Sequence, residues 1–291
     1  MPKLQGNPTL PSATILVFVS IASTQLGSAL AKTVIQELGS VTTVLMRVGF
    51  GAVVLLLLQR PKLKGYNYSA YGLLILFGLV MAAMNLSFYA AIEQIPLGIA
   101  VTLEFLGPLG VACLNSRQLL YLFWIFLAGI GIFLLAPITG SSLEPLGVTF
   151  ALLAAICWGA YILLSAKVGK VFAETKGIAL MTAALAAGTV VLLPFGILST
   201  GITKLEPKFL AIGLGVANLS SAIPYTVELA ALKKIPIRVF GVLMSLEPAI
   251  ATLLGLIILK ETISDRALVA IILVSLASLG SSLFEKRRSL D

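Results

Sequence analysis

The stretch AAIEQIP at residues 90–96 returns as AALKKIP at residues 230–236. Twelve residues beyond each copy stands another proline, Pro108 in the first case and Pro248 in the second, so both landmarks repeat at a spacing of 140 residues. This spacing predicts that the chain holds two copies of one structural unit. We place the copies at residues 1–138 and 139–291.

The composition tells which kind of unit is repeated. Of the 291 residues, 59% are hydrophobic and 11% are charged, whereas about 25% are charged in an ordinary soluble domain. The mean hydropathy is +1.07. A soluble fold must cover its outside with polar groups, so it could not bury this much apolar surface. We therefore predict an all-α integral membrane protein.

Apolar runs long enough to cross a bilayer, which takes about 20 residues, occur ten times. They cover residues 13–31, 40–59, 70–92, 97–115, 119–137, 146–167, 176–199, 208–231, 236–259 and 265–284. Turn and charge signals separate them, for instance at residues 60–65, 115–117, 139–142 and 204–208. Each unit then holds five helices. Because five is odd, the second unit enters the membrane from the opposite side, which gives two inverted repeats, an arrangement typical of transporters. The alternative is a gene duplication in a structural membrane protein.

The basic residues predict the orientation in the membrane. If the N-terminus is cytoplasmic, fourteen Lys and Arg residues fall in inside segments and five in outside segments. Positive residues are enriched on the cytoplasmic side, so we expect both termini to be cytoplasmic. An alternative, in which Ala29–Ala31 ends a cleaved signal peptide, fits less well because the repeat requires this segment as a helix.

Several classes of function are excluded or disfavoured by what the chain lacks. It has no histidine and two cysteines, Cys113 and Cys157, both in apolar runs, so we expect no metal site and no cofactor. Asp265 and Asp291, at a span start and at the C-terminus, cannot form the aspartate pair of an intramembrane protease, and we predict no enzyme. The net charge of +8 is scattered between spans and does not indicate nucleic acid as a partner. A channel would need a continuous polar pore, which the short polar patches do not supply.

Glutamates inside the spans are candidate functional groups, because an ionisable side chain in lipid is costly unless it faces protein or water. Glu104 lies in mid-span before Pro108, and Glu247 stands beside Pro248. Each proline lacks an N–H and can break its helix. The repeat pairs Glu104 with Met244, so the two glutamates project about 60° apart on equivalent faces. The alternative for both is a carboxyl that only stabilises helix packing.

A polar stripe runs along the segment 208–231, where four residues lie at helical spacing: Asn218, Ser221, Tyr225 and Glu228. We favour substrate contact for Tyr225 and Glu228, and interhelical hydrogen bonds for Asn218 and Ser221. The repeat places Asn85 opposite Tyr225, with Tyr89 one turn further on.

Other polar residues complete the set of candidates. Trp158 and Tyr161 share one helix face with Ser165, and Trp158 lies too deep in its span for an interfacial aromatic belt. We expect Arg47 to reach toward the interface rather than to form a salt bridge with a carboxylate of a helix, and Gln25 and Ser28 to serve helix packing. The candidate substrate-binding residues are therefore Asn85, Tyr89, Glu104, Trp158, Tyr161, Tyr225 and Glu228.

The motifs carry a resemblance over nearly the whole chain. MNLSFY (residues 84–89), IPLGIAVTLEFLGPL (95–109), CWGAYIL (157–163), IPYTVE (223–228) and FGVLMSLEPA (240–249) resemble the drug/metabolite transporter superfamily of the EamA type. The resemblance implies ten helices in two inverted five-helix units around a central cavity, located in a bacterial inner membrane, and export of small amino acids such as threonine and homoserine. Other amino acids, metabolites or drugs remain the alternative, by export or by facilitated diffusion.

Uphill export needs a source of energy. The chain has no phosphate-binding loop for ATP, so an ion gradient, most simply of protons, is the expected source. Without histidine, the proton carrier must be a carboxyl group within the spans. Glu104 is the first candidate, followed by Glu228 and Glu247.

Overall fold

Helices make up nearly all of the computed structural model, which describes residues 9–59, 61, 65–114, 120–135, 144–199 and 203–284. No strand occurs in these ranges, and the predicted all-α class is confirmed. A helix satisfies its backbone polar groups internally, which is the condition for crossing lipid. The predicted breaks at 115–117 and 139–142, like both chain ends, lie outside the described residues.

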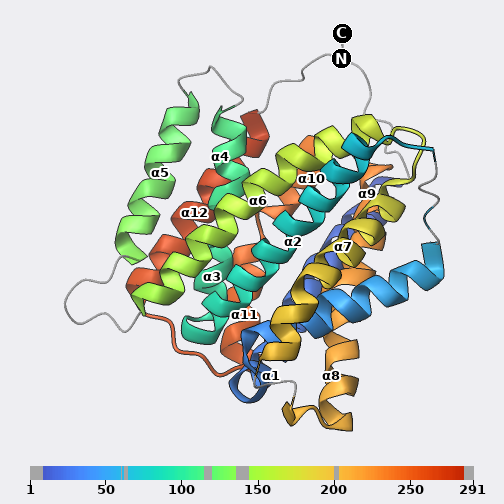
Figure 1. Cartoon of the computed structure of the whole chain (residues 1–291). Helices are drawn as coiled ribbons and strands as arrows, with labels where there is room; N and C mark the ends of the chain where they lie inside the picture. The colour runs from blue at the N-terminus through green and yellow to red at the C-terminus, as the bar shows by residue number, and fades with distance from the viewer. Residues whose placement is uncertain are drawn as a thin grey trace, which may run out of the picture.

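Twelve α-helices and one π-helix, η2, follow one another along the described chain (Figure 1). Their bounds are α1 Thr9–Gln59, α2 Tyr68–Gln94, α3 Leu97–Glu104, α4 Leu106–Leu114, α5 Leu120–Leu135, α6 Pro145–Val171, α7 Gly177–Leu198, α8 Pro207–Ala217, η2 Asn218–Ala222, α9 Ile223–Leu232, α10 Ile237–Met244, α11 Glu247–Ile258 and α12 Asp265–Phe284.

The first helix, α1, consists of two limbs. Gly39 has φ +75° and ψ 162°, a left-handed backbone conformation that glycine adopts without the steric cost of a Cβ. The limbs 9–38 and 40–59 therefore point in different directions, and the break lies between the first two predicted apolar runs.

Within the described parts of the chain, seven helical stretches are long and apolar enough to cross a membrane, counting both limbs of α1 as one. Two shorter apolar helices, Leu97–Ala112 and Leu122–Leu135, add to them. Large apolar side chains such as Leu57, Ile156 and Val190 lie on the outside of the bundle. The chain is therefore a multi-pass membrane protein whose outer surface faces lipid tails.

Two broken helices occupy equivalent places in the sequence. Pro96 and Pro236 precede α3 and α10 with nearly the same backbone angles (φ −57° and −59°, ψ 142° and 144°), and each of these helices has eight residues. The helix then breaks, at Phe105 in one case and at Ser245–Leu246 in the other. Pro108 and Pro248 follow in the first turns of α4 and α11, where the missing N–H leaves no hydrogen bond unmade.

The helices pack closely where small residues meet. α2 lies against α6 and α7, while α5 pairs with α12 (Figure 1). A Cβ on Gly78 would overlap the main chain of α7 at Ala184, and a Cβ on Gly107 would overlap that of α6 at Ala155. Small residues let helix backbones approach in lipid, where van der Waals packing takes the place of the hydrophobic effect.

One ion pair joins three segments that are far apart in the sequence. Lys32 Nζ lies 2.6 Å from Glu261 Oε1 and also donates to the carbonyl of Ile95 at 2.7 Å. Glu261 Oε2 accepts from the Leu97 N–H at 3.0 Å. Both side chains of the pair are mostly buried. The pair thus holds α1 and the α2–α3 turn to the segment before α12.

This network predicts a stability loss when its charge is removed. In Glu261→Gln, Lys32 keeps a partner of similar shape but loses the carboxylate. The unfolding free energy should fall by about 1.5–3 kcal/mol, the typical worth of a hydrogen bond to a charged group. The melting temperature of the purified protein in detergent measures the loss.

Glu206→Gln is the matched control, because Glu206 pairs with Lys208 where both side chains are exposed. Its melting temperature should equal that of the parent protein. Equal melting temperatures for the two variants would show that the Lys32–Glu261 pair adds nothing to the packing.

Candidate functional site

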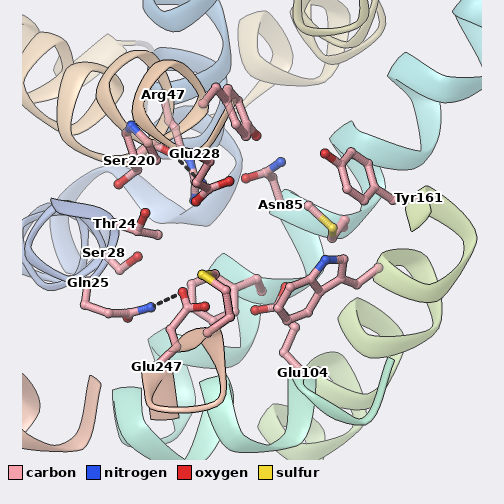
Figure 2. Close-up of a pocket in the computed structure, with 16 residues that line it drawn as sticks. Thr24, Gln25, Ser28, Arg47, Asn85, Glu104, Tyr161, Ser220, Glu228 and Glu247 are labelled. Atoms are coloured by element: carbon pink, nitrogen blue, oxygen red, sulfur yellow. Dashed lines mark hydrogen bonds between the residues drawn. The ribbon is translucent and has the colours of Figure 1, made fainter. Parts of the chain in front are cut away.

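A polar cavity of about 140 Å³ lies inside the bundle (Figure 2). It is roughly ten times the space that a single water needs. Both halves of the chain contribute, since its wall includes residues of α1, α2 and α3 as well as α6, η2, α9, α10 and α11. The lining residues are Thr24, Gln25, Ser28, Arg47, Met84, Asn85, Phe88, Glu104, Trp158, Tyr161, Ser220, Pro224, Tyr225, Glu228, Met244 and Glu247.

Most of the residues that the sequence singled out face this one cavity. Six of the seven candidate substrate-binding residues line it, and so do the three candidate proton carriers. The exception is Tyr89, which is completely buried and not part of the wall. Pro108 and Pro248 also lie away from the wall, while the glutamates near them, Glu104 and Glu247, line it.

The prediction for Arg47 is wrong. Its side chain does not reach the membrane interface but is buried, with 7% of its surface exposed, and lines the cavity. Its Nη2 donates to the carbonyl of Ser220 at 3.0 Å, and its guanidinium carbon lies 5.2 Å from the centre of the Tyr89 ring. A Tyr ring attracts a cation placed over its face. Tyr89 therefore does not line the cavity itself but packs against Arg47 and helps to hold it in place.

Gln25 and Ser28 were expected to serve packing alone, yet both line the cavity. Gln25 Nε2 donates to Glu247 Oε1 at 2.7 Å, a bond that Figure 2 shows as a dashed line. This bond joins the first limb of α1 to α11. The helical spacing of Thr24, Gln25 and Ser28 on one run could have indicated a polar face, but short polar residues of this kind are also common where helices pack.

The three carboxyl groups have different surroundings. Glu247 accepts from Gln25, and Glu228 Oε1 accepts from Ser20 Oγ at 2.5 Å. Glu104 forms no hydrogen bond or ion pair with the other described residues. It is thus the carboxyl with the most freedom to bind something that enters the cavity.

The π-helix η2 changes which residues of this segment face inward. The predicted stripe assumed a regular helix through Asn218, Ser221 and Tyr225. A π-turn closes hydrogen bonds over five residues instead of four, and the carbonyl of Asn218 accepts from the Ile223 N–H. The change of phase brings Ser220 into the wall beside Tyr225.

The predicted interhelical hydrogen bonds of this stripe are also wrong. Asn218 donates to the carbonyl of Leu214 in its own helix, at 2.8 Å. The buried hydroxyl of Ser221 has no hydrogen-bond partner among the described residues. The spacing in the sequence could not reveal these partners, because one extra residue in a helical turn rotates all of the following side chains about the helix axis.

Aromatic rings form one wall of the cavity. Trp158 packs edge-on against Phe105 with ring centres 5.0 Å apart, and Tyr161 stacks on Phe77 at 5.2 Å. The Tyr161 hydroxyl contacts Met181 Sδ at 3.6 Å. Ser165, predicted on the same face, bonds to the carbonyl of Ile162 in its own helix. The aromatic contacts fix the wall in shape, which favours a small ligand of defined size.

The cavity therefore brings three carboxyl groups and one guanidinium to the walls of one space inside the bundle. Within the described residues no ion pair links them, and no cluster suited to a metal ion occurs. Such a site offers both signs of charge and several neutral hydrogen-bonding groups. It matches a small molecule that carries a positive and a negative group.

Comparisons with known proteins agree with the fold. A family model described as the EamA-like transporter family matches residues 145–283. The threonine/homoserine exporter RhtA of Salmonella typhimurium (strain LT2) is 34% identical over 275 residues, covering 94% of this chain and 92% of that protein. RhtA of Escherichia coli K12 is 35% identical over 278 residues, with the same coverage. A solved crystal structure shares the fold, at a TM-score of 0.57 and 18% identity, over 96% of this chain and 99% of its own.

The close contact between α1 and η2 predicts a sensitive position in the cavity wall. A Cβ on Gly27 would overlap Ser220 Oγ and lie 2.9 Å from Leu219 Cβ. Gly27→Ala should therefore push η2 away and lower the unfolding free energy by about 1–3 kcal/mol, the usual cost of overpacking. Thermal unfolding of the purified variant measures the effect.

Gly72→Ala is the control, since nothing lies within 4 Å of a Cβ added to Gly72 in α2. Alanine also favours a helix over glycine, so this variant should be at least as stable as the parent. A Gly27→Ala protein with unchanged stability would mean that η2 is not held against α1 as described.

Proposed function

We infer the function from a premise that the comparisons establish: the chain belongs to the EamA-like transporter family, and it is a transporter rather than an enzyme. We propose that it exports small amino acids, of the threonine and homoserine kind, from the cytoplasm by alternating access. The observation that carries the proposal is the match to threonine/homoserine exporters over 94% of the chain. The cavity supports it, because its two signs of charge suit an amino acid.

The proposed topology has ten spans in a bacterial inner membrane with both termini cytoplasmic. The break at Gly39 divides α1 into two limbs, so the seven long stretches supply eight spans, and the two shorter apolar helices bring the number to ten. The excess of Lys and Arg in alternate connections supports the orientation.

The proposed architecture is an inverted repeat of residues 1–138 and 139–291. In its favour, Pro96 with α3 and Pro236 with α10 match in backbone angles, in helix length and in the position of the break that follows. Two copies of one unit that can exchange conformations would open the cavity to either side in turn.

Within the cavity we assign the substrate ammonium group to Glu104. This carboxylate makes no hydrogen bond or ion pair with the other described residues, and an ammonium ion supplies three donors. The polar groups of Asn85, Trp158, Tyr161, Tyr225 and Glu228 stand around it and would hold the rest of the molecule. Tyr89 would contribute indirectly, through Arg47.

We further propose that protons drive the export. Moving one charge through the membrane potential is worth about 2.3 kcal/mol per 100 mV, enough to sustain a gradient of solute. Glu104 is the proposed carrier, since it lies in the cavity next to the break at Phe105. Glu228 and Glu247 are the next choices.

The substrate proposal predicts efflux of threonine and homoserine. Cells preloaded with labelled threonine should lose it faster when they produce this chain than when they carry the empty vector, and should tolerate higher external concentrations of both amino acids. Unchanged efflux of both, together with efflux of another amino acid or a drug, would move the chain to a different substrate.

The coupling proposal predicts a separation of two activities in Glu104→Gln. In proteoliposomes this variant should still exchange labelled for unlabelled amino acid, because an amide can accept the ammonium protons. It should lose accumulation driven by a pH gradient, because an amide does not carry a proton under these conditions.

Glu93→Gln, in α2 but away from the cavity wall, is the control and should retain both activities. Full uphill transport by Glu104→Gln would remove Glu104 from the coupling role. If the parent protein moves solute only down its concentration gradient, whatever pH gradient is imposed, the protein is a facilitator.

A further inference from the structure

Arg47 is a buried cation that makes no direct ion pair with the other described residues. It lies on the second limb of α1 with 7% of its surface exposed. No carboxylate of the described residues lies within 4 Å of its guanidinium. Taking a charge out of water is costly unless a partner compensates, and an intramembrane charge is expected to have a functional role.

The contacts of Arg47 leave donors free. The guanidinium has five N–H donors. Nη2 is used by the carbonyl of Ser220 at 3.0 Å, and the face of the ion lies over the Tyr89 ring. Nε is buried with no hydrogen-bond partner among the described residues. The tyrosine and the carbonyl thus hold the group in place without neutralising it.

The acidic residues of the cavity are engaged elsewhere or stand apart. Glu228 is bonded to Ser20 and Glu247 to Gln25. Glu104 interacts with Arg47 electrostatically, but it lies on the other side of the cavity in Figure 2 and forms no ion pair with it. The guanidinium therefore faces a space that an incoming anion could enter.

Ser220, whose carbonyl accepts from Arg47, carries a second donor. Its Oγ is buried and has no hydrogen-bond partner among the described residues, and the residue belongs to the cavity wall. The π-turn of η2 places Ser220 at this position in the wall. A guanidinium together with a hydroxyl offers the donors that a carboxylate accepts.

We propose that Arg47, with Ser220 Oγ, receives the carboxylate of the transported amino acid and so makes the cavity selective for molecules that carry one. This inference rests on the proposed function and deepens it. The substrate then lies between Arg47 and Glu104, its carboxylate at one and its ammonium at the other. Cationic amines and amino alcohols, which match only the acidic side, are disfavoured because they leave Arg47 unpaired.

Equilibrium binding to the purified protein tests the inference, with L-threonine and threoninol as probes. Threoninol keeps the ammonium and the side chain but replaces the carboxylate by a hydroxymethyl group. The parent protein should bind threonine about tenfold to a hundredfold more tightly than threoninol, as expected for a charge-assisted pair. In Arg47→Gln this preference should disappear through loss of threonine affinity, while the affinity for threoninol stays within about twofold.

Two further variants separate this role from a structural one. Arg47→Lys keeps the charge and should retain part of the preference. Arg266→Gln removes an arginine that likewise donates to a carbonyl, that of Phe133 at 3.2 Å, but lies outside the cavity wall. It should bind both probes as the parent does.

Four results would overturn the inference. A parent protein that binds both probes equally, or an Arg47→Gln variant that keeps the preference for threonine, would remove Arg47 from carboxylate recognition while leaving the proposed function intact. Equal losses of affinity for both probes in Arg47→Gln would mean that Arg47 only maintains the structure of the cavity. A parent protein that binds neither threonine nor any other amino acid would overturn the proposed function itself, and the inference with it.

Discussion

In lipid, each polar group of the chain must find its partner within the protein, and this constraint governs the structure. Water is absent from the bilayer core, so an unpaired backbone or side-chain group there costs several kcal/mol. The helices satisfy their own backbones, and the serine and threonine side chains mostly bond back to their own helix, as Thr102 does to Gly98. The places where partners are missing therefore stand out. Five of them lie at the cavity, where Gln25, Ser28, Arg47, Ser220 and Glu247 each keep a buried polar atom without a hydrogen-bond partner among the described residues.

The helical framework could be predicted from the sequence because it depends on composition and length alone. Apolar runs of membrane-spanning length and the repeat around Pro96 and Pro236 are visible in a single chain. Seven of the sixteen lining residues could also be found, among them Glu104, Glu228 and Glu247, which are ionisable groups within apolar runs. Arg47 was misjudged because a long side chain near a span end usually reaches the interface. Two features could not be predicted from the sequence: the direction that the second limb of α1 takes after Gly39, and the extra residue in the turn of η2. Together they bring Arg47 and Ser220 to the same wall of the cavity.

The same arrangement accounts for the proposed transport cycle. The broken helices α3–α4 and α10–α11 each contribute a glutamate at or next to the break, Glu104 and Glu247. Away from the cavity, the Lys32–Glu261 pair ties the first half of the chain to the second at the end where the α2–α3 turn lies. In a cycle of alternating access, an ion pair of this kind would have to break on one side of the membrane while the cavity closes toward the other side. Charged side chains in this protein thus serve two purposes. Some bind the substrate in the proposed mechanism, and others hold one half of the chain to the other.

The most direct measurement is an experimental structure of the protein with bound L-threonine. The account predicts density for one threonine in the cavity, with its carboxylate within hydrogen-bond distance of Arg47 and its ammonium within hydrogen-bond distance of Glu104. Threonine bound outside this cavity, or bound in it with the carboxylate turned away from Arg47, would contradict the account.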